Sequence, residues 1–71
     1  MKLTPPMVEL LTDITTHEQY YVSTYGPWGR TARALEHRGL AAVRDLEGRQ
    51  SEVKATDDGR REAVRRGLVA A

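Results

Sequence analysis

Apolar residues recur at helical spacing in the first part of the chain. They are Met7, Val8, Leu10, Leu11 and Ile14. Intervals of three and four residues place such side chains along one side of a helix. Thr4 can cap the first backbone N–H groups, and the two prolines that follow it suit a first helical turn. The pattern predicts a helix over residues 5–16.

The next segment has extended rather than helical character. Residues 20–25 are Tyr-Tyr-Val-Ser-Thr-Tyr, and Gly26 and Pro27 follow them. Aromatic and β-branched residues favour strands, and a Gly-Pro pair favours a turn. We therefore expect an extended segment over residues 19–25.

Helix-forming residues return after this turn. Residues 30–38 are good helix formers, and Gly39 stands where a left-handed residue would end a helix. The pattern predicts a helix over residues 29–38 that buries Leu35 and presents Arg33 to solvent.

A hairpin and a last helix complete the predicted order α-β-α-β-β-α. Two extended runs flank a Glu-Gly-Arg turn, which predicts a hairpin over residues 42–55. Thr56 can then cap a helix over residues 57–67, whose first turn holds two acids that the helix dipole favours. The expected fold class is a small α+β domain.

Length and composition limit the class of protein. The 71 residues, 39% of them hydrophobic, suffice for a single domain over residues 1–71 with a stability of only a few kcal/mol. The chain has no cysteine, so disulfides and thiolate metal sites are excluded and a cytoplasmic location is expected. No apolar run approaches the roughly 18 residues of a membrane span, and we expect no membrane association.

The net charge of the chain is small, but the charged residues are unevenly distributed. The formal net charge is +1, but residues 1–29 carry −2 and residues 30–71 carry +3, with all nine arginines in the second part. Nucleic-acid-binding surfaces require a local excess of basic side chains. We therefore expect any such surface in the second part of the chain.

The second part also resembles a known family. Residues 31–41 (Thr-Ala-Arg-Ala-Leu-Glu-His-Arg-Gly-Leu-Ala), the hairpin, and residues 55–60 (Ala-Thr-Asp-Asp-Gly-Arg) resemble, in order and spacing, part of the winged helix-turn-helix domain of MarR-like repressors. The resemblance implies a winged-helix-like fold with a recognition helix in the DNA major groove and a wing on the flanking backbone. It implies a transcriptional regulator that binds double-stranded DNA, as a homodimer if it recognises an operator.

The chain departs from that family before its second helix. The family has the first helix of the helix-turn-helix at this place, and only residues 20–29 are left for it here. We expect that helix to be reduced or missing, with the tyrosine-rich segment in its place. Small proteins of actinobacterial phages with a Tyr-Gly-Pro-Trp-Gly-Arg run are loosely similar, which suggests a phage or bacterial origin.

The candidate DNA contacts lie on the second helix and the hairpin. They are Arg30, Thr31, Arg33, His37, Arg44, Arg49 and Lys54. Arginine can pair bidentately with guanine in the major groove, and cations on a wing can bind phosphates. The alternative is a solvated helix face and a hairpin whose own acids nearly cancel its positive charge.

All four aromatic residues lie between positions 20 and 28, and they support a second functional hypothesis. We expect Tyr20, Val22 and Trp28 to fill the space of the absent helix. Tyr21 and Tyr25 fall on the opposite strand face and are expected to stay partly exposed. Exposed tyrosines are typical of protein-binding surfaces, so the alternative function is an interaction module for a host protein.

Catalytic and metal-binding chemistry finds no support in the sequence. His17 and His37 are twenty residues apart, and neither belongs to a triad or a metal-ligating pair. Helix capping explains the two acids at positions 57 and 58, and solvation together with the helix dipole explains the arginines of the last helix. We expect no enzyme, no cofactor and no metal.

Overall fold

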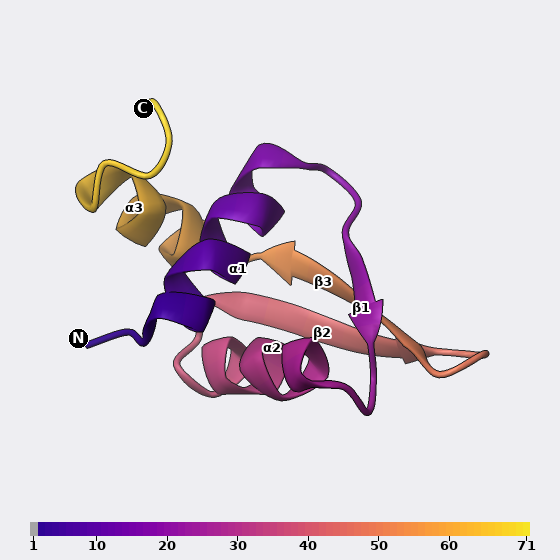
Figure 1. The fold of residues 1–71 in the computed structure, drawn as a ribbon. Coiled ribbons are helices and arrows are strands. Elements are labelled where there is room, and N and C mark those ends of the chain that lie inside the picture. The colour runs from indigo at the N-terminus through magenta and orange to yellow at the C-terminus, as the bar shows by residue number, and fades with distance from the viewer. Residues whose placement is uncertain (1) are drawn as a thin grey trace.

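The computed structural model describes residues 2–71, which form three helices and three strands (Figure 1). They are α1 (Pro5–Thr16), β1 (Tyr21–Ser23), α2 (Pro27–His37), β2 (Ala41–Leu46), β3 (Gln50–Ala55) and α3 (Asp57–Arg65). The element order and the α+β class agree with the sequence prediction. α1 spans the residues that its apolar stripe predicted, and Thr4 Oγ1 caps it by accepting a hydrogen bond from the Met7 N–H at 3.4 Å.

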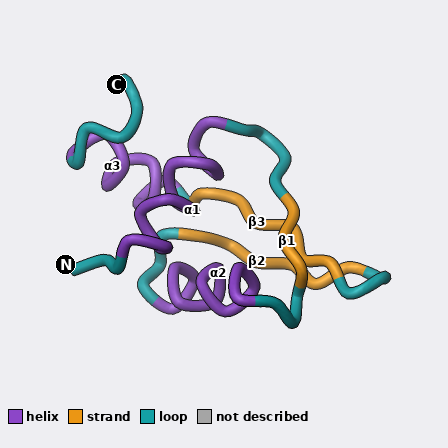
Figure 2. Tube along the Cα trace, in the orientation of Figure 1, coloured by secondary structure: helices purple, strands orange, loops and turns teal. Residues whose placement is uncertain are grey.

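The strands form one antiparallel sheet in the order β1-β3-β2 (Figure 2). In the central strand β3, Val53 lies opposite Val43 of β2, and Ser51 lies opposite Val22 of β1. The β2–β3 hairpin extends past β1 (Figure 1). Because neighbouring side chains of a strand alternate between faces, positions 41, 43 and 45 of β2 share one face and positions 42, 44 and 46 the other.

The hydrophobic core lies between the helices and one face of the sheet. Its buried members are Met7, Leu10, Leu11 and Ile14 of α1, Ala32 and Leu35 of α2, Val22, Ala41 and Val53 of the strands, Leu40, and Ala63 of α3. Leu10, Leu11 and Leu35 are fully buried. Each such side chain contributes roughly 1.5–3 kcal/mol by leaving water. The core is therefore the main source of stability in this small fold.

α2 begins earlier than the sequence predicted. Its first helical residue is Pro27, two positions before Gly29, and Gly26 is the N-cap. Proline suits the first turn because its fixed φ is helical and its missing N–H would have no partner there. Only residues 24–26 separate β1 from α2, so no helix lies between them.

The end of α2 follows the prediction for Gly39, which has φ +77°. The N–H groups of Gly39 and Leu40 donate to the carbonyls of Glu36 and Leu35 at 2.9 and 3.0 Å. These two bonds make a Schellman motif, which ends the helix and turns the chain toward β2. β2 itself begins at Ala41, one residue before the predicted hairpin boundary.

α3 is shorter than predicted and packs closely on the loop before β2. It ends at Arg65 rather than residue 67. Thr56 caps it by accepting a hydrogen bond from the Gly59 N–H at 3.0 Å. A Cβ on Gly59 would overlap the carbonyl oxygen of Leu40, so only glycine allows this approach. No helix within residues 2–71 combines the length and apolar character needed to cross a membrane.

Candidate functional site

The outward side of α2 carries the first group of candidate contacts. Its inner side buries Gly29, Ala32 and Leu35, whereas Arg30 and His37 are exposed. Arg30 makes no ion pair within the part of the chain that the structure describes. Thr31 is partly buried, and its hydroxyl donates to the Pro27 carbonyl at 3.0 Å. Arg30 and His37 are thus the candidate side chains of α2 that are both exposed and outside the ion pairs of the fold.

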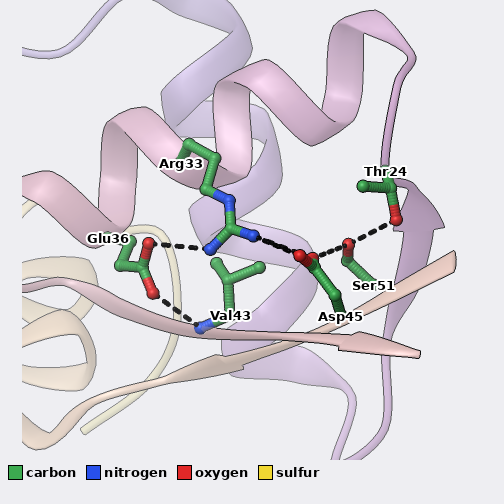
Figure 3. A network of polar contacts seen from close by, with 6 residues as sticks. All are labelled: Thr24, Arg33, Glu36, Val43, Asp45 and Ser51. Carbon is green, nitrogen blue, oxygen red and sulfur yellow. Dashed lines mark hydrogen bonds and ion pairs between the residues drawn. The ribbon is translucent and has the colours of Figure 1, made fainter.

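Arg33, in contrast, is held inside the molecule's own polar network (Figure 3). Its Nη2 donates to both carboxylate oxygens of Asp45 at 2.8 Å, and its Nη1 donates to Glu36 Oε1 at 3.1 Å. The hydrogen bond to Glu36, and then the charges of both acids, raise the pKa of Arg33 above its already high ordinary value. Two carboxylates therefore compensate the charge of this side chain.

The network continues from Asp45 across the sheet. Asp45 Oδ1 accepts a hydrogen bond from the Ser51 hydroxyl at 2.8 Å, and the hydroxyls of Ser51 and Thr24 share a hydrogen bond of 2.7 Å. At its other end, Glu36 Oε2 accepts from the backbone N–H of Val43 at 3.4 Å. Side chains from α2, β2, β3 and the β1–α2 connection are thereby joined (Figure 3).

Arg44 and Lys54 lie on the sheet face that points away from α2. The contact between Arg33 and Asp45 fixes which face of β2 is toward the helix, and Arg44 is on the other one. Arg44 pairs there with Glu52 at 2.9 Å. Lys54 lines an open cavity of about 390 Å³ at the base of the hairpin, together with Glu18 and Arg60. The structure does not bring these two cations together with Arg30.

Arg49 lies at the tip of the hairpin, near the β1–α2 connection. Its backbone carbonyl accepts a hydrogen bond from the Thr24 N–H at 2.9 Å. Its φ is +64°, next to Gly48 at +78°, so two successive residues of the turn are left-handed. Its side chain is exposed and makes no ion pair with any described residue. We call residues 24–33 and 44–51 the hairpin end of the molecule.

Exposed aromatic side chains are concentrated at or near the hairpin end. Tyr25 is 78% exposed and Tyr21 is 45% exposed, as expected from the strand pattern. Val22 is buried, and Tyr20 is half-buried against the core, with its hydroxyl donating to Asp13 Oδ2 at 3.0 Å. Burial, followed by this hydrogen bond, raises the pKa of Tyr20.

Trp28 is not buried as expected for a residue that fills the space of the absent helix, because it is 39% exposed. The helix starts at Pro27, so Trp28 belongs to the first turn of α2 rather than to the extended segment. Trp28 precedes Gly29, which is the first buried residue of α2.

The sequence interpretation also missed the role of Asp45. Strand alternation is a signal for this role, because it places Asp45 on the same face of β2 as Ala41 and Val43. What it could not give was the identity of that partner, since Arg33 is twelve residues away on another element.

The arginines of α3 are also largely compensated within the fold. Arg61 pairs with Asp58, and both Arg65 and Arg66 pair with Glu62. The hydrogen bond from Arg65 and then that from Arg66 lower the pKa of Glu62 to about 2. Among the described residues, no group of three or more histidines and acids is placed to hold a metal ion. No protein-family model, curated protein or solved structure matches the chain.

Proposed function

We propose that the chain is a winged-helix DNA-binding domain that has lost the first helix of its helix-turn-helix and serves as a phage or bacterial transcriptional regulator. The observation that carries this proposal is the topology. α2 leads directly into the β2–β3 hairpin, β3 is the central strand of the β1-β3-β2 sheet, and α3 returns to pack near α1. This order supports the proposal, because in it a recognition helix would be followed directly by a wing.

The proposed interface is smaller than the sequence predicted. Arg30 and His37 on α2 face the major groove, and Arg49 at the hairpin tip contacts a flanking phosphate. Thr31 borders this surface with its hydroxyl bonded to the backbone. With Arg30 and Arg49 as the two arginines of this interface, the slope of log affinity against log salt is expected to be only about −2. So small a footprint binds an operator well only as a homodimer.

An electrophoretic mobility-shift assay on mixed-sequence duplex DNA tests the proposal. Arg30→Ala and Arg49→Ala should each weaken binding at low salt and reduce the salt slope by about 0.9. Arg60→Ala is the matched control, because Arg60 is exposed and makes no ion pair with any described residue. It belongs to α3, which lies at the end of the molecule opposite the hairpin tip (Figure 1). Its binding should equal that of the wild type. Absence of salt-sensitive binding by the wild type would contradict DNA binding.

A second candidate function is binding to a protein. Two observations favour it. Tyr21, Tyr25 and Trp28 are exposed. The carboxylates of Glu36 and Asp45 also compensate the charge of Arg33, which reduces the positive charge of this surface. Aromatic and arginine side chains are the usual anchors of protein interfaces. A pull-down with the wild type and a Tyr21→Ala/Tyr25→Ala double variant tests it. This candidate fails if the variant captures the same proteins equally well.

A further inference from the structure

We infer that Arg33 is a positioning residue that clamps the hairpin to α2, and that this clamp supplies the bracing which a preceding helix gives in an ordinary helix-turn-helix. Such a helix normally holds the recognition helix in place. Residues 24–26 leave no room for one between β1 and α2. The hairpin must therefore be held against α2 by other contacts.

The guanidinium group of Arg33 is well suited to this task. It binds Asp45 through both carboxylate oxygens at 2.8 Å and Glu36 through one at 3.1 Å. Because two nitrogens of one planar group hold the two carboxylates, Nη2 for Asp45 and Nη1 for Glu36, the guanidinium fixes the directions of both acids, which the single nitrogen of a lysine does not do. Because Asp45 belongs to β2 and Glu36 to α2, the fixed direction is that of the hairpin relative to the helix (Figure 3).

The same network holds the turn that replaces the missing helix. Asp45 also binds the buried hydroxyl of Ser51, and Ser51 binds Thr24 in the β1–α2 connection. The Thr24 N–H then donates to the Arg49 carbonyl at the hairpin tip. The carboxylate of Glu36 accepts a hydrogen bond from the backbone N–H of Val43 on the edge strand β2. Helix, hairpin and connection therefore form one hydrogen-bonded unit with Arg33 at its centre.

A clamp and a DNA contact make opposite predictions for Asp45→Asn. If Arg33 contacts phosphate, removal of the competing negative charge frees it and tightens DNA binding. If Arg33 is a clamp, the amide cannot accept two charge-assisted hydrogen bonds, the hairpin loosens and DNA binding weakens. The affinity part of this contrast rests on the proposed function, whereas the loosening of the hairpin does not.

Hydrogen exchange of the β2 and β3 amides in the full chain tests the clamp directly. Arg33→Ala and Asp45→Asn should each exchange about five-fold faster in the hairpin, because a loss of about this size follows from one broken ion pair of good geometry. Asp58→Asn is the matched control. It breaks the pair with Arg61 on α3 and should leave hairpin exchange unchanged. Equal hairpin exchange in Asp45→Asn and the wild type overturns the inference.

Arg33→Lys separates charge from geometry. Lysine keeps the positive charge but has only one nitrogen, which cannot hold Asp45 and Glu36 in the directions that two guanidinium nitrogens set, so the clamp predicts hairpin exchange close to that of Arg33→Ala. Wild-type exchange in Arg33→Lys contradicts the clamp.

Binding of the same variants to mixed-sequence duplex DNA gives a second readout. The clamp predicts weaker binding by Asp45→Asn with the wild-type salt slope, and tighter binding by that variant overturns it. If neither the wild type nor any variant binds DNA, the proposed function fails. Hydrogen exchange alone then tests whether Arg33 clamps the hairpin.

Discussion

The helical core and the hairpin end of this protein are stabilised by different interactions. In the core, formed by the buried sides of α1, α2 and α3 with one face of the sheet, apolar residues such as Leu10 and Leu35 are fully buried. At the hairpin end, ion pairs and hydrogen bonds connect the elements, and Tyr25 and Arg49 are exposed. The core therefore determines whether the chain folds, and the hairpin end determines which polar and aromatic side chains are exposed beside it.

The two regions also tolerate change differently. A buried leucine contributes several times more free energy than an exposed ion pair, whose typical contribution is about 0–1 kcal/mol. Substitutions at the hairpin end should therefore alter binding while the fold persists. Substitutions in the core should instead unfold the chain and abolish binding with it.

The largest expected effect is that of Leu35→Ala. Its side chain is fully buried between α2 and the rest of the core, so truncation should cost about 2–5 kcal/mol of the free energy of unfolding. That is most of the stability expected for 71 residues. Urea denaturation measures it, with Val64→Ala as the control because Val64 is 38% exposed. Equal losses in the two variants would contradict the assignment of the core.

Gly59→Ala should have the next largest effect on stability. Alanine is the better helix former by about 1 kcal/mol, yet the added Cβ overlaps the Leu40 carbonyl, and such overpacking costs about 1–3 kcal/mol. Thermal unfolding should therefore show a lower Tm for Gly59→Ala. Arg60→Ala, at the neighbouring exposed position, should change stability by less than about 0.5 kcal/mol. A raised Tm in Gly59→Ala would show that α3 does not pack on Leu40.

Arg49→Gly should separate stability from binding at the hairpin end. A left-handed φ of +64° is costly for arginine and free for glycine, so the variant should gain up to about 1 kcal/mol in the free energy of unfolding. Its affinity for mixed-sequence duplex DNA should nevertheless fall, because a phosphate contact is lost. Denaturation and mobility-shift assays on the same preparation measure both. Parallel changes in stability and affinity would contradict the separation.

The smallest effect is the pH dependence caused by Glu62 on the surface of α3. Its pKa is lowered to about 2 in the folded chain from an ordinary value of 4.5, first by the hydrogen bond from Arg65 and then by that from Arg66. The stabilisation is therefore fully present above pH 4.5 and is lost as the pH falls toward 2. Glu62→Gln should flatten this part of the curve of Tm against pH. An unchanged slope would mean that the ion pairs of α3 do not contribute.

Local chemistry explains how much of the fold could be predicted. The caps at Thr4 and Thr56 and the left-handed Gly39 depend on residues within a few positions, and the structure shows all three at the expected helix ends. The sequence predicts the start of α2 two residues too late, because Gly26 and Pro27 together are typical of a turn whereas Pro27 is the first helical residue.

The candidate site was harder to predict, because it depends on the register of the sheet. The sequence identified Arg33 and Arg44 as exposed cations but gave no information on which carboxylates would lie opposite them. Strand pairing places Glu52 beside Arg44, and packing of α2 on β2 places Asp45 beside Arg33. Such pairs join distant positions, and only the three-dimensional arrangement reveals them.

Nuclear magnetic resonance titration with mixed-sequence duplex DNA tests the central claim most directly. Backbone amide shifts report where the ligand contacts the chain, residue by residue. The claim predicts that the amides of the hairpin end and of His37 shift in a salt-dependent manner while those of α3 stay in place, although α3 holds three arginines. Shifts confined to α3, or an unchanged spectrum at low salt, would contradict the assignment of the binding surface to the hairpin end.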